Sequence, residues 1–264
     1  MRITLFFVLL VSYLYTNAQE NERLRDSIFK YQFLNPNLAI EYGMEYVELR
    51  SADDPDQEMV RTYSKIGEIL LYMELYSSSL DYFNTALRIL NSIKKDGDGN
   101  SLYSKNDPPW IVLNIGNIYF KNRNYEKALE KFKEARKLFE IEENPMDILN
   151  GFNTSNSNIG LVYGALGEYD MQEKIYYKVY DKLFSNPGEG ENYKSNLLYR
   201  MSQLLSVKLL KGELISAKNK LNEITQFFEV EKNNESDLST SLLTRNYGYT
   251  PVSYTHLRAH ETRG

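Results

Sequence analysis

The feature that most constrains this chain is a recurring pattern of glycine, aromatic and small residues at fixed spacing. Its clearest copy is LNIGNIYFKNRNYEKALEKFKEA, residues 113–135. Two amphipathic runs flank the Asn-rich segment 122–124, which predicts two helices joined by a short turn. Gly116 would let a neighbouring helix approach closely, and Ala128 and Ala135 are small where helices would cross. This stretch therefore predicts a helical hairpin.

The pattern recurs along the chain. The first-helix glycine returns as Gly67 and Gly160, and a weaker copy has Leu205 at that position. Gly67 to Gly116 is 49 residues, Gly116 to Gly160 is 44, and Gly160 to Leu205 is 45. The residues expected to pack the helix pairs are Gly67, Phe83, Ala86, Gly116, Tyr119, Tyr125, Ala128, Phe132, Ala135, Gly160, Tyr163, Tyr169 and Tyr176. An earlier pair is expected from Leu24 to Leu34 and from Pro36 onward.

These residues stand at the consensus spacing of the tetratricopeptide repeat, and the chain resembles that family. The copies are longer than the roughly 34-residue period of the family, with the excess after each second helix, in segments rich in Gly, Pro, Asn and Ser. Some copies depart from the small-residue pattern, with Ser79, Gln172 and Val179 at such positions. The resemblance implies an all-α fold of helix-turn-helix repeats stacked in a right-handed superhelical solenoid, with long inter-repeat loops.

The two ends of the chain are expected to lie outside this fold. Residues 1–18 have one basic residue, an apolar run from Ile3 to Tyr15 and a small Ala18, as in a secretory signal peptide cleaved after Ala18. An uncleaved anchor is the alternative. Residues 19–250 are expected to form an array of about four to five repeats, the first and fourth degenerate and the last cut short. This organisation predicts an exported, periplasmic protein.

The C-terminal segment 251–264 is expected to be non-native. Val252 to Thr262 match, codon by codon, the translation of an adapter used in transposase-based sequencing libraries. This segment holds the only histidines of the chain, His256 and His260, spaced i, i+4 and followed by Glu261. If the segment were genomic, that trio would be a candidate metal site.

Composition and motifs exclude several functions. The formal net charge is −5 and there is no cysteine, so disulfides, thiolate metal sites and a cysteine nucleophile are ruled out. An acidic chain without basic blocks argues against nucleic-acid binding. Phosphate-binding glycine motifs and a nucleophile elbow are absent from the sequence, and outside the tail there is no histidine for a Ser-His-Asp arrangement. We therefore expect neither catalysis nor a cofactor.

One loop resembles a calcium site weakly. Asp96, Asp98, Asn100 and Asp107 stand at positions 1, 3, 5 and 12 of a twelve-residue loop. Ser101 takes position 6, where the sharp turn calls for glycine. A flexible polar insertion is the main interpretation of this segment, so no metal site is predicted.

Protein binding is the function that these exclusions leave. The resemblance implies that the partner binds in a concave groove lined by first-helix positions. Large aromatic residues there are plausible anchors for a peptide. Alternatively, Trp110 packs only against its preceding loop through Pro108 and Pro109. The groove lacks the Lys and Asn pair of the carboxylate clamp that chaperone-binding relatives use, which disfavours chaperone docking. The positions are Arg61, Ser64, Glu68, Leu71 and Tyr72; Trp110, Leu113, Asn117, Phe120 and Lys121; Thr154, Ser157, Leu161, Gly164 and Ala165; and Tyr199, Ser202, Ser206, Leu209 and Leu210.

The whole arrangement resembles the exported N-terminal repeat region of Bacteroidota-type sensor and regulator proteins. That resemblance implies a periplasmic interaction array that binds a peptide or protein segment, followed in the intact protein by a transmembrane helix and an output module. The alternative is a self-contained periplasmic scaffold or envelope-assembly factor with no output domain.

Overall fold

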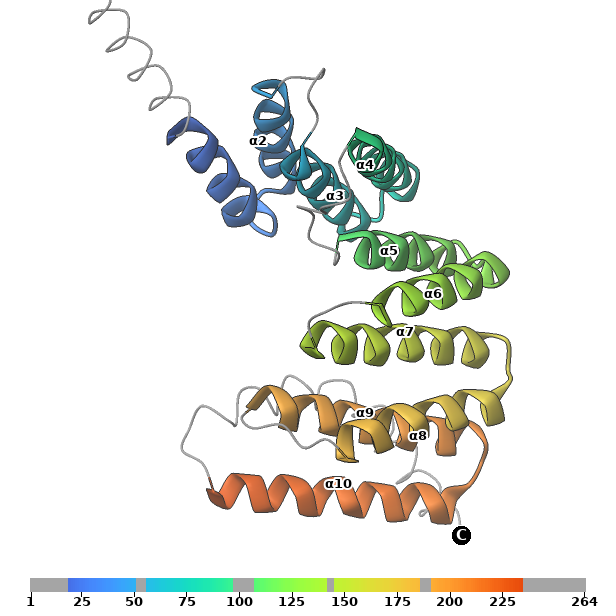
Figure 1. Cartoon of the computed structure of the whole chain (residues 1–264). Helices are drawn as coiled ribbons and strands as arrows, with labels where there is room; N and C mark the ends of the chain where they lie inside the picture. Colours follow the sequence, from blue (N-terminus) through green and yellow to red (C-terminus); the bar gives the residue numbers. More distant parts are fainter. Residues whose placement is uncertain (1–18, 51–55, 97–106, 142–144, 186–190, 235–264) are drawn as a thin grey trace, which may run out of the picture. The chain divides into compact units, whose positions relative to one another are not determined.

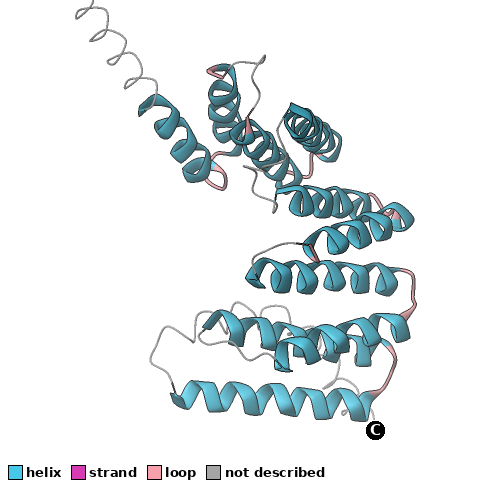
Figure 2. Ribbon diagram, in the orientation of Figure 1, coloured by secondary structure: helices cyan, strands magenta, loops and turns pink. Residues whose placement is uncertain are grey.

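The computed structural model describes residues 19–50, 56–96, 107–141, 145–185 and 191–234, which are helices joined by short turns, without strands (Figures 1 and 2). Residues 19–31 are helical. The elements that follow are α2 (Pro36–Glu48), α3 (Gln57–Tyr72), α4 (Tyr76–Asp96), α5 (Asp107–Lys121), α6 (Tyr125–Phe139), α7 (Pro145–Ala165), α8 (Tyr169–Ser185), α9 (Glu191–Leu210) and α10 (Leu214–Asn234). The chain divides into two compact units, residues 1–122 and 123–264, which we call the first and second unit.

Consecutive helices alternate as the first and second members of helical pairs. Four of the pair-connecting turns have three residues, and the middle residue of each has a positive φ: Glu74 at 61°, Arg123 at 58°, Gly167 at 78° and Gly212 at 73°. The turn predicted at residues 122–124 lies between α5 and α6 as expected. Four different sequences thus adopt the same turn conformation, with a left-handed residue in the middle.

The earliest pair, residues 19–31 with α2, is the one that the sequence marked least clearly. Asn35 caps α2 by accepting a hydrogen bond from the Leu38 N–H at 3.3 Å, and Pro36 takes the first helical position. Leu24 and Ile28 pack against Ala39 and Tyr46 of α2 and Ile69 of α3. The pair therefore has a core like that of its neighbours although it lacks their glycine landmark.

The rest of the first unit packs around the hairpin of α3 and α4. Phe83, Ala86 and Leu90 of α4 bury their side chains with Val60 of α3 and Ile111 of α5. Gly67 permits this contact, because a Cβ there would lie 2.9 Å from the Phe83 ring. Ser79 also fits at a small-residue position, because its buried hydroxyl donates to the Gly67 carbonyl at 2.7 Å.

The second unit repeats these contacts with larger side chains. A Cβ at Gly160 would lie 2.3 Å from the Tyr176 ring, so α7 and α8 approach as closely as the glycine allows. Leu205, which replaces the glycine in α9, is fully buried with Leu198, Ala217 and other apolar residues of α8 to α10. In the weaker fourth copy, the Leu205 side chain therefore fills the space that a close helix approach closes in the other copies.

The expected all-α fold of helix-turn-helix repeats is confirmed in the described residues. Residues 1–18 and 251–264, with the proposed signal and the histidine pair, lie outside them, as do the central residues of the calcium-loop candidate. None of the described helices is long and apolar enough to cross a membrane.

Candidate functional site: a pocket in the first unit

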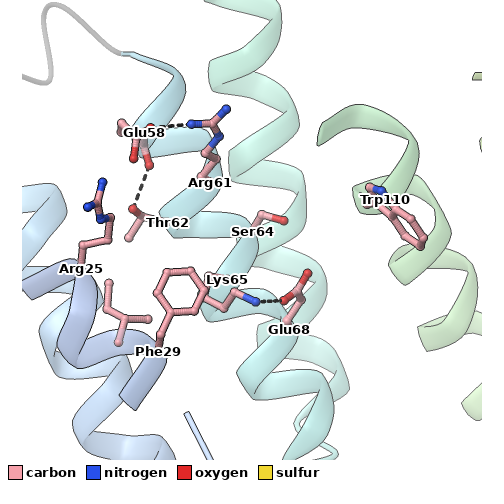
Figure 3. Close-up of a pocket in the computed structure, with 10 residues that line it drawn as sticks. Arg25, Phe29, Glu58, Arg61, Thr62, Ser64, Lys65, Glu68 and Trp110 are labelled. Carbon is pink, nitrogen blue, oxygen red and sulfur yellow. Dashed lines mark hydrogen bonds and ion pairs between the residues drawn. The ribbon is translucent and has the colours of Figure 1, made fainter. Parts of the chain in front are cut away.

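A pocket of about 420 Å³ opens in the first unit between three first helices (Figure 3). Residues 19–31 form one wall, α3 forms the floor and Trp110, near the start of α5, stands at the far side. The lining residues are Arg25, Ile28, Phe29, Glu58, Arg61, Thr62, Ser64, Lys65, Glu68 and Trp110.

Helix α3 supplies most of the lining, because its lining residues recur at the spacing of one helix face. Residues 58, 61, 62, 65 and 68 follow at intervals of one, three or four and share a helix face. The helix start is fixed by Asp56, whose carboxylate accepts from the Met59 N–H at 2.9 Å and forms an ion pair with Arg50. The buried Thr62 donates its hydroxyl to the Glu58 carbonyl at 2.8 Å, so its methyl group faces the packing side.

The charges of the pocket are unevenly paired. Arg61 Nη1 lies 2.6 Å from Glu58 Oε1, and Lys65 forms an ion pair with Glu68, both within α3. Arg25 forms no hydrogen bond or ion pair with any residue that the structure describes. Three cationic groups therefore meet two carboxylates, and the surplus charge is positive in a chain whose net charge is −5.

An aromatic surface lies beside these charges. Phe29 is 52% exposed, and Lys65 Nζ lies 5.3 Å from the centre of its ring. Ile28 below it is buried, and Trp110 is half-buried. Aromatic and arginine side chains are typical anchors of protein interfaces.

The predicted groove residues do not all come together. Arg61, Ser64, Glu68 and Trp110 line the pocket. Tyr72, at the other end of α3, is exposed and packs edge to face on Phe33 with 5.5 Å between ring centres.

On α5, Leu113 is buried, so its side chain offers little surface to a partner. Asn117 is half-buried and contacts Asn114, and at the end of the helix Phe120 is half-buried and Lys121 exposed. Tyr199 belongs to the second unit.

Sequence reasoning missed the wall formed by residues 19–31. Arg25 and Phe29 come from the degenerate first pair, where no glycine fixes the register, so no groove position was assigned there. The spacing of Arg25, Ile28 and Phe29 is a helical signal that could have identified this face once the pair was recognised. Among the described residues no cluster of acidic residues and histidines could hold a metal ion.

Comparison with protein families identifies the repeat. The family model described as tetratricopeptide repeat matches residues 111–140, which span most of α5 and all of α6. The RNA polymerase-associated protein CTR9 of Saccharomyces cerevisiae is 23% identical over 164 residues, which are 62% of this chain and 13% of that protein. The chain thus spans only a small part of the length of that relative.

Solved structures share the fold at low identity. RapI in its apo form is 15% identical with a TM-score of 0.64, over 89% of this chain and 84% of that one. BtubC from P. vanneervenii is 14% identical with a TM-score of 0.58, over 84% and 94%. PilF of Pseudomonas aeruginosa is 12% identical with a TM-score of 0.54, over 93% and 99%. Residues 111–140 thus match a tetratricopeptide repeat, and the chain shares its fold with solved helical-repeat proteins. Tetratricopeptide repeats are typically modules for protein–protein interaction.

Proposed function

We propose that this tetratricopeptide-repeat protein binds a segment of a partner protein in the pocket of the first unit. This proposal rests on one observation: a single cavity holds the exposed Phe29 ring and Arg25, which has no partner among the described residues. An apolar side chain of the partner would enter beside Phe29 and Trp110, and an acidic group would pair with Arg25. A pocket of about 420 Å³ lies within the usual range of sites that take a small group, about 300–1,000 Å³.

The α3 ion pairs favour this assignment over a purely structural pocket. Glu58 and Glu68 are neutralised on their own helix, so they would not repel an acidic partner. Arg25 then attracts it across a cavity of mixed apolar and polar lining. Exposed ion pairs add only about 0–1 kcal/mol each to stability, so folding alone gives little reason for this concentration of charge.

Selection from a displayed random peptide library, followed by calorimetric titration, tests the proposal. Peptides selected on the full chain should lose at least tenfold in affinity on Arg25→Glu, because the charge is reversed, and should not bind Ser64→Trp, because the new ring fills the pocket. Arg88→Glu makes the same charge change on an exposed residue of α4 outside the pocket and should change the affinity less than twofold. Selected peptides that bind both pocket variants like the unaltered chain would overturn the assignment.

We further propose that the protein is exported and acts as the sensing half of a membrane-anchored regulator. The apolar run near the N-terminus and the small Ala18 support export. Expression in a Gram-negative host should yield a periplasmic protein whose first residue is Gln19. A membrane-bound protein that retains Met1 would instead support the uncleaved anchor.

A self-contained periplasmic scaffold is the competing proposal. Sequencing the source locus across the codon for Thr250 separates the two. About 20 apolar residues followed by an output module would support the regulator, because that length spans a bilayer. A stop codon after one or two more repeats would support the scaffold.

A further inference from the structure

The second unit contains a buried cation that no carboxylate neutralises. Arg200 of α9 is 6% exposed, and it forms no ion pair with any described residue. Burial lowers the pKa of Arg200, but a guanidinium stays charged at any pH at which the protein is folded. An unpaired buried charge is costly, and natural chains normally pair it or lose it.

The hydrogen bonds of Arg200 use only one side of the guanidinium. Nη1 donates to the Ser157 hydroxyl of α7 and to Gln203 Oε1 at 3.0 Å. Nε is buried without a partner, and Nη2 forms no hydrogen bond, although it is not among the fully buried atoms. Nε and Nη2 are the fork that receives the two oxygens of a carboxylate side by side. No described residue therefore bonds to the fork, and one of its ends reaches solvent.

A further donor belongs to the residue that Arg200 Nη1 contacts. The Gln203 amide is oriented by its bond to Arg200, and its Nε2 is buried without a partner. Tyr199 stands over the guanidinium, with 4.8 Å between Arg200 Cζ and the ring centre, and it is 41% exposed. A change of the Tyr199 side-chain rotamer would open the fork to a ligand, which is a motion that exposed side chains make in picoseconds to nanoseconds.

Neighbouring groups do not supply the missing anion. The Ser157 hydroxyl donates to the Asn153 carbonyl and so only accepts from Arg200. The nearby Tyr176 phenol is neutral, because burial raises its pKa to about 12. Glu173 of α8 is already held by Lys208 and Lys211. The positive charge of Arg200 is therefore not neutralised by these groups.

We propose that Arg200, held by Gln203 and covered by Tyr199, is a binding site for a carboxylate group. The source is an acidic side chain of a protein partner or a free small carboxylate, which share this chemistry. The site lies in the second unit and does not depend on the pocket of the first unit.

Titration of the full chain with sodium acetate, against sodium chloride at equal ionic strength, tests the site by the NMR signal of the Arg200 Nε–H. Acetate should shift this signal saturably and chloride should not. Arg200→Met should weaken acetate binding at least tenfold, as judged by the acetate-dependent rise in Tm, since charge-assisted hydrogen bonds to a carboxylate are lost. Tyr199→Ala should strengthen the binding, and Asn219→Ala, on an exposed face of α10, should leave it unchanged.

Stability gives an independent readout. If Arg200 is kept for ligand binding, Arg200→Met should keep or raise the Tm without acetate. The reason is that an apolar side chain of similar length replaces a desolvated charge. A linear response to acetate, or an acetate response that Arg200→Met retains, would overturn the proposal. If Arg200→Met does not fold, the same comparison is made with Arg200→Lys, which keeps the charge and loses the fork.

Peptide titrations then identify the source. Blocked peptides that carry one Asp should bind more tightly than their Asn counterparts if a protein segment is the ligand. Equal binding of the two peptides, together with saturable acetate binding, would assign the site to a free carboxylate.

Discussion

Glu74 and Arg123 have positive φ angles, a conformation that is energetically unfavourable for residues other than glycine. Both are the middle residue of a pair-connecting turn, where Gly167 and Gly212 stand in the second unit. The left-handed region costs a non-glycine residue about 1–2 kcal/mol, partly offset by the larger entropy of glycine in the unfolded chain. We expect Arg123→Gly to raise the free energy of unfolding by about 0.5–1 kcal/mol, measured by urea denaturation.

Gly167→Ala is the matched reverse change. A Cβ there meets nothing within 4 Å, so its effect reports the backbone alone. It should lower the free energy of unfolding by about 1 kcal/mol. A loss of stability in Arg123→Gly would show that its side chain contributes more than the strained φ costs.

A second residue-scale prediction concerns Gly164 and Gln172, one of the departures from the repeat consensus. Gln172 is buried where the family has a small residue, and a Cβ on Gly164 would lie 2.5 Å from its Nε2. Glycine at position 164 of α7 therefore leaves room for the larger side chain of Gln172 on α8. Gly164→Ala should cost about 1 kcal/mol of stability, because the buried amide end of Gln172 must shift and the gain in helix propensity offsets only part of that.

The double variant Gly164→Ala with Gln172→Ala checks this explanation. The shorter side chain at position 172 removes the clash, so the two changes should be coupled favourably by about 1 kcal/mol or more in a double-mutant cycle. Additive effects in urea denaturation would mean that Gly164 is required by something other than Gln172.

At the scale of elements, charge joins α8 to α9 and to the turn that follows it. Lys208 Nζ and Lys211 Nζ lie 2.8 and 2.5 Å from Glu173, and Lys211 also reaches Glu213 of the turn at 2.7 Å. Burial acts to raise the pKa of Glu173, but the two ammonium groups outweigh it, and the pKa is lowered overall. The network therefore stabilises the fold only while Glu173 is ionised.

The pH dependence follows from that direction. Because the folded pKa of Glu173 lies below its unfolded value, its stabilisation is complete above the unfolded pKa of about 4.3 and is lost as the pH falls through the folded pKa. Glu173→Gln should lower the free energy of unfolding at pH 7 by about 1–3 kcal/mol and flatten its fall between pH 5 and 3. Glu130→Gln, on an exposed position of α6, should alter neither. An unchanged slope in Glu173→Gln would remove Glu173 from the pH response.

Across these elements, the sequence was most informative where one residue type is physically required. Gly67 and Gly160 lie against Phe83 and Tyr176 because only glycine leaves room for a ring, so the repeat spacing predicts those contacts. Arg25 and Arg200 could not be foreseen, since lysine and arginine usually lie on solvated helix faces. Whether a cation is paired depends on neighbours from other helices, and a single sequence does not reveal them.

For the whole molecule, a repeat architecture implies that stability is local. In repeat arrays a pair contacts only its neighbours in sequence, so within each unit damage should spread over adjacent pairs rather than through the chain. Phe83 is fully buried in the core of the first unit, with Val60, Leu90 and Ile111. Phe83→Ala should cost about 3–5 kcal/mol within that core, and its effect should be visible in hydrogen exchange.

The expected result is faster exchange in α3, α4 and α5, with α9 and α10 unchanged. Leu205→Ala, in the core of the second unit, is the matched change. It should give the opposite pattern of hydrogen exchange, with faster exchange in α9 and α10 and no change in α3 and α4. The two effects on stability should also add in the double variant, because residues without shared partners act independently. If either substitution accelerates exchange throughout residues 19–234, the chain unfolds as one cooperative body. A ligand at either proposed site would then stabilise both units equally, whereas local unfolding predicts that each ligand protects only the unit that holds its site.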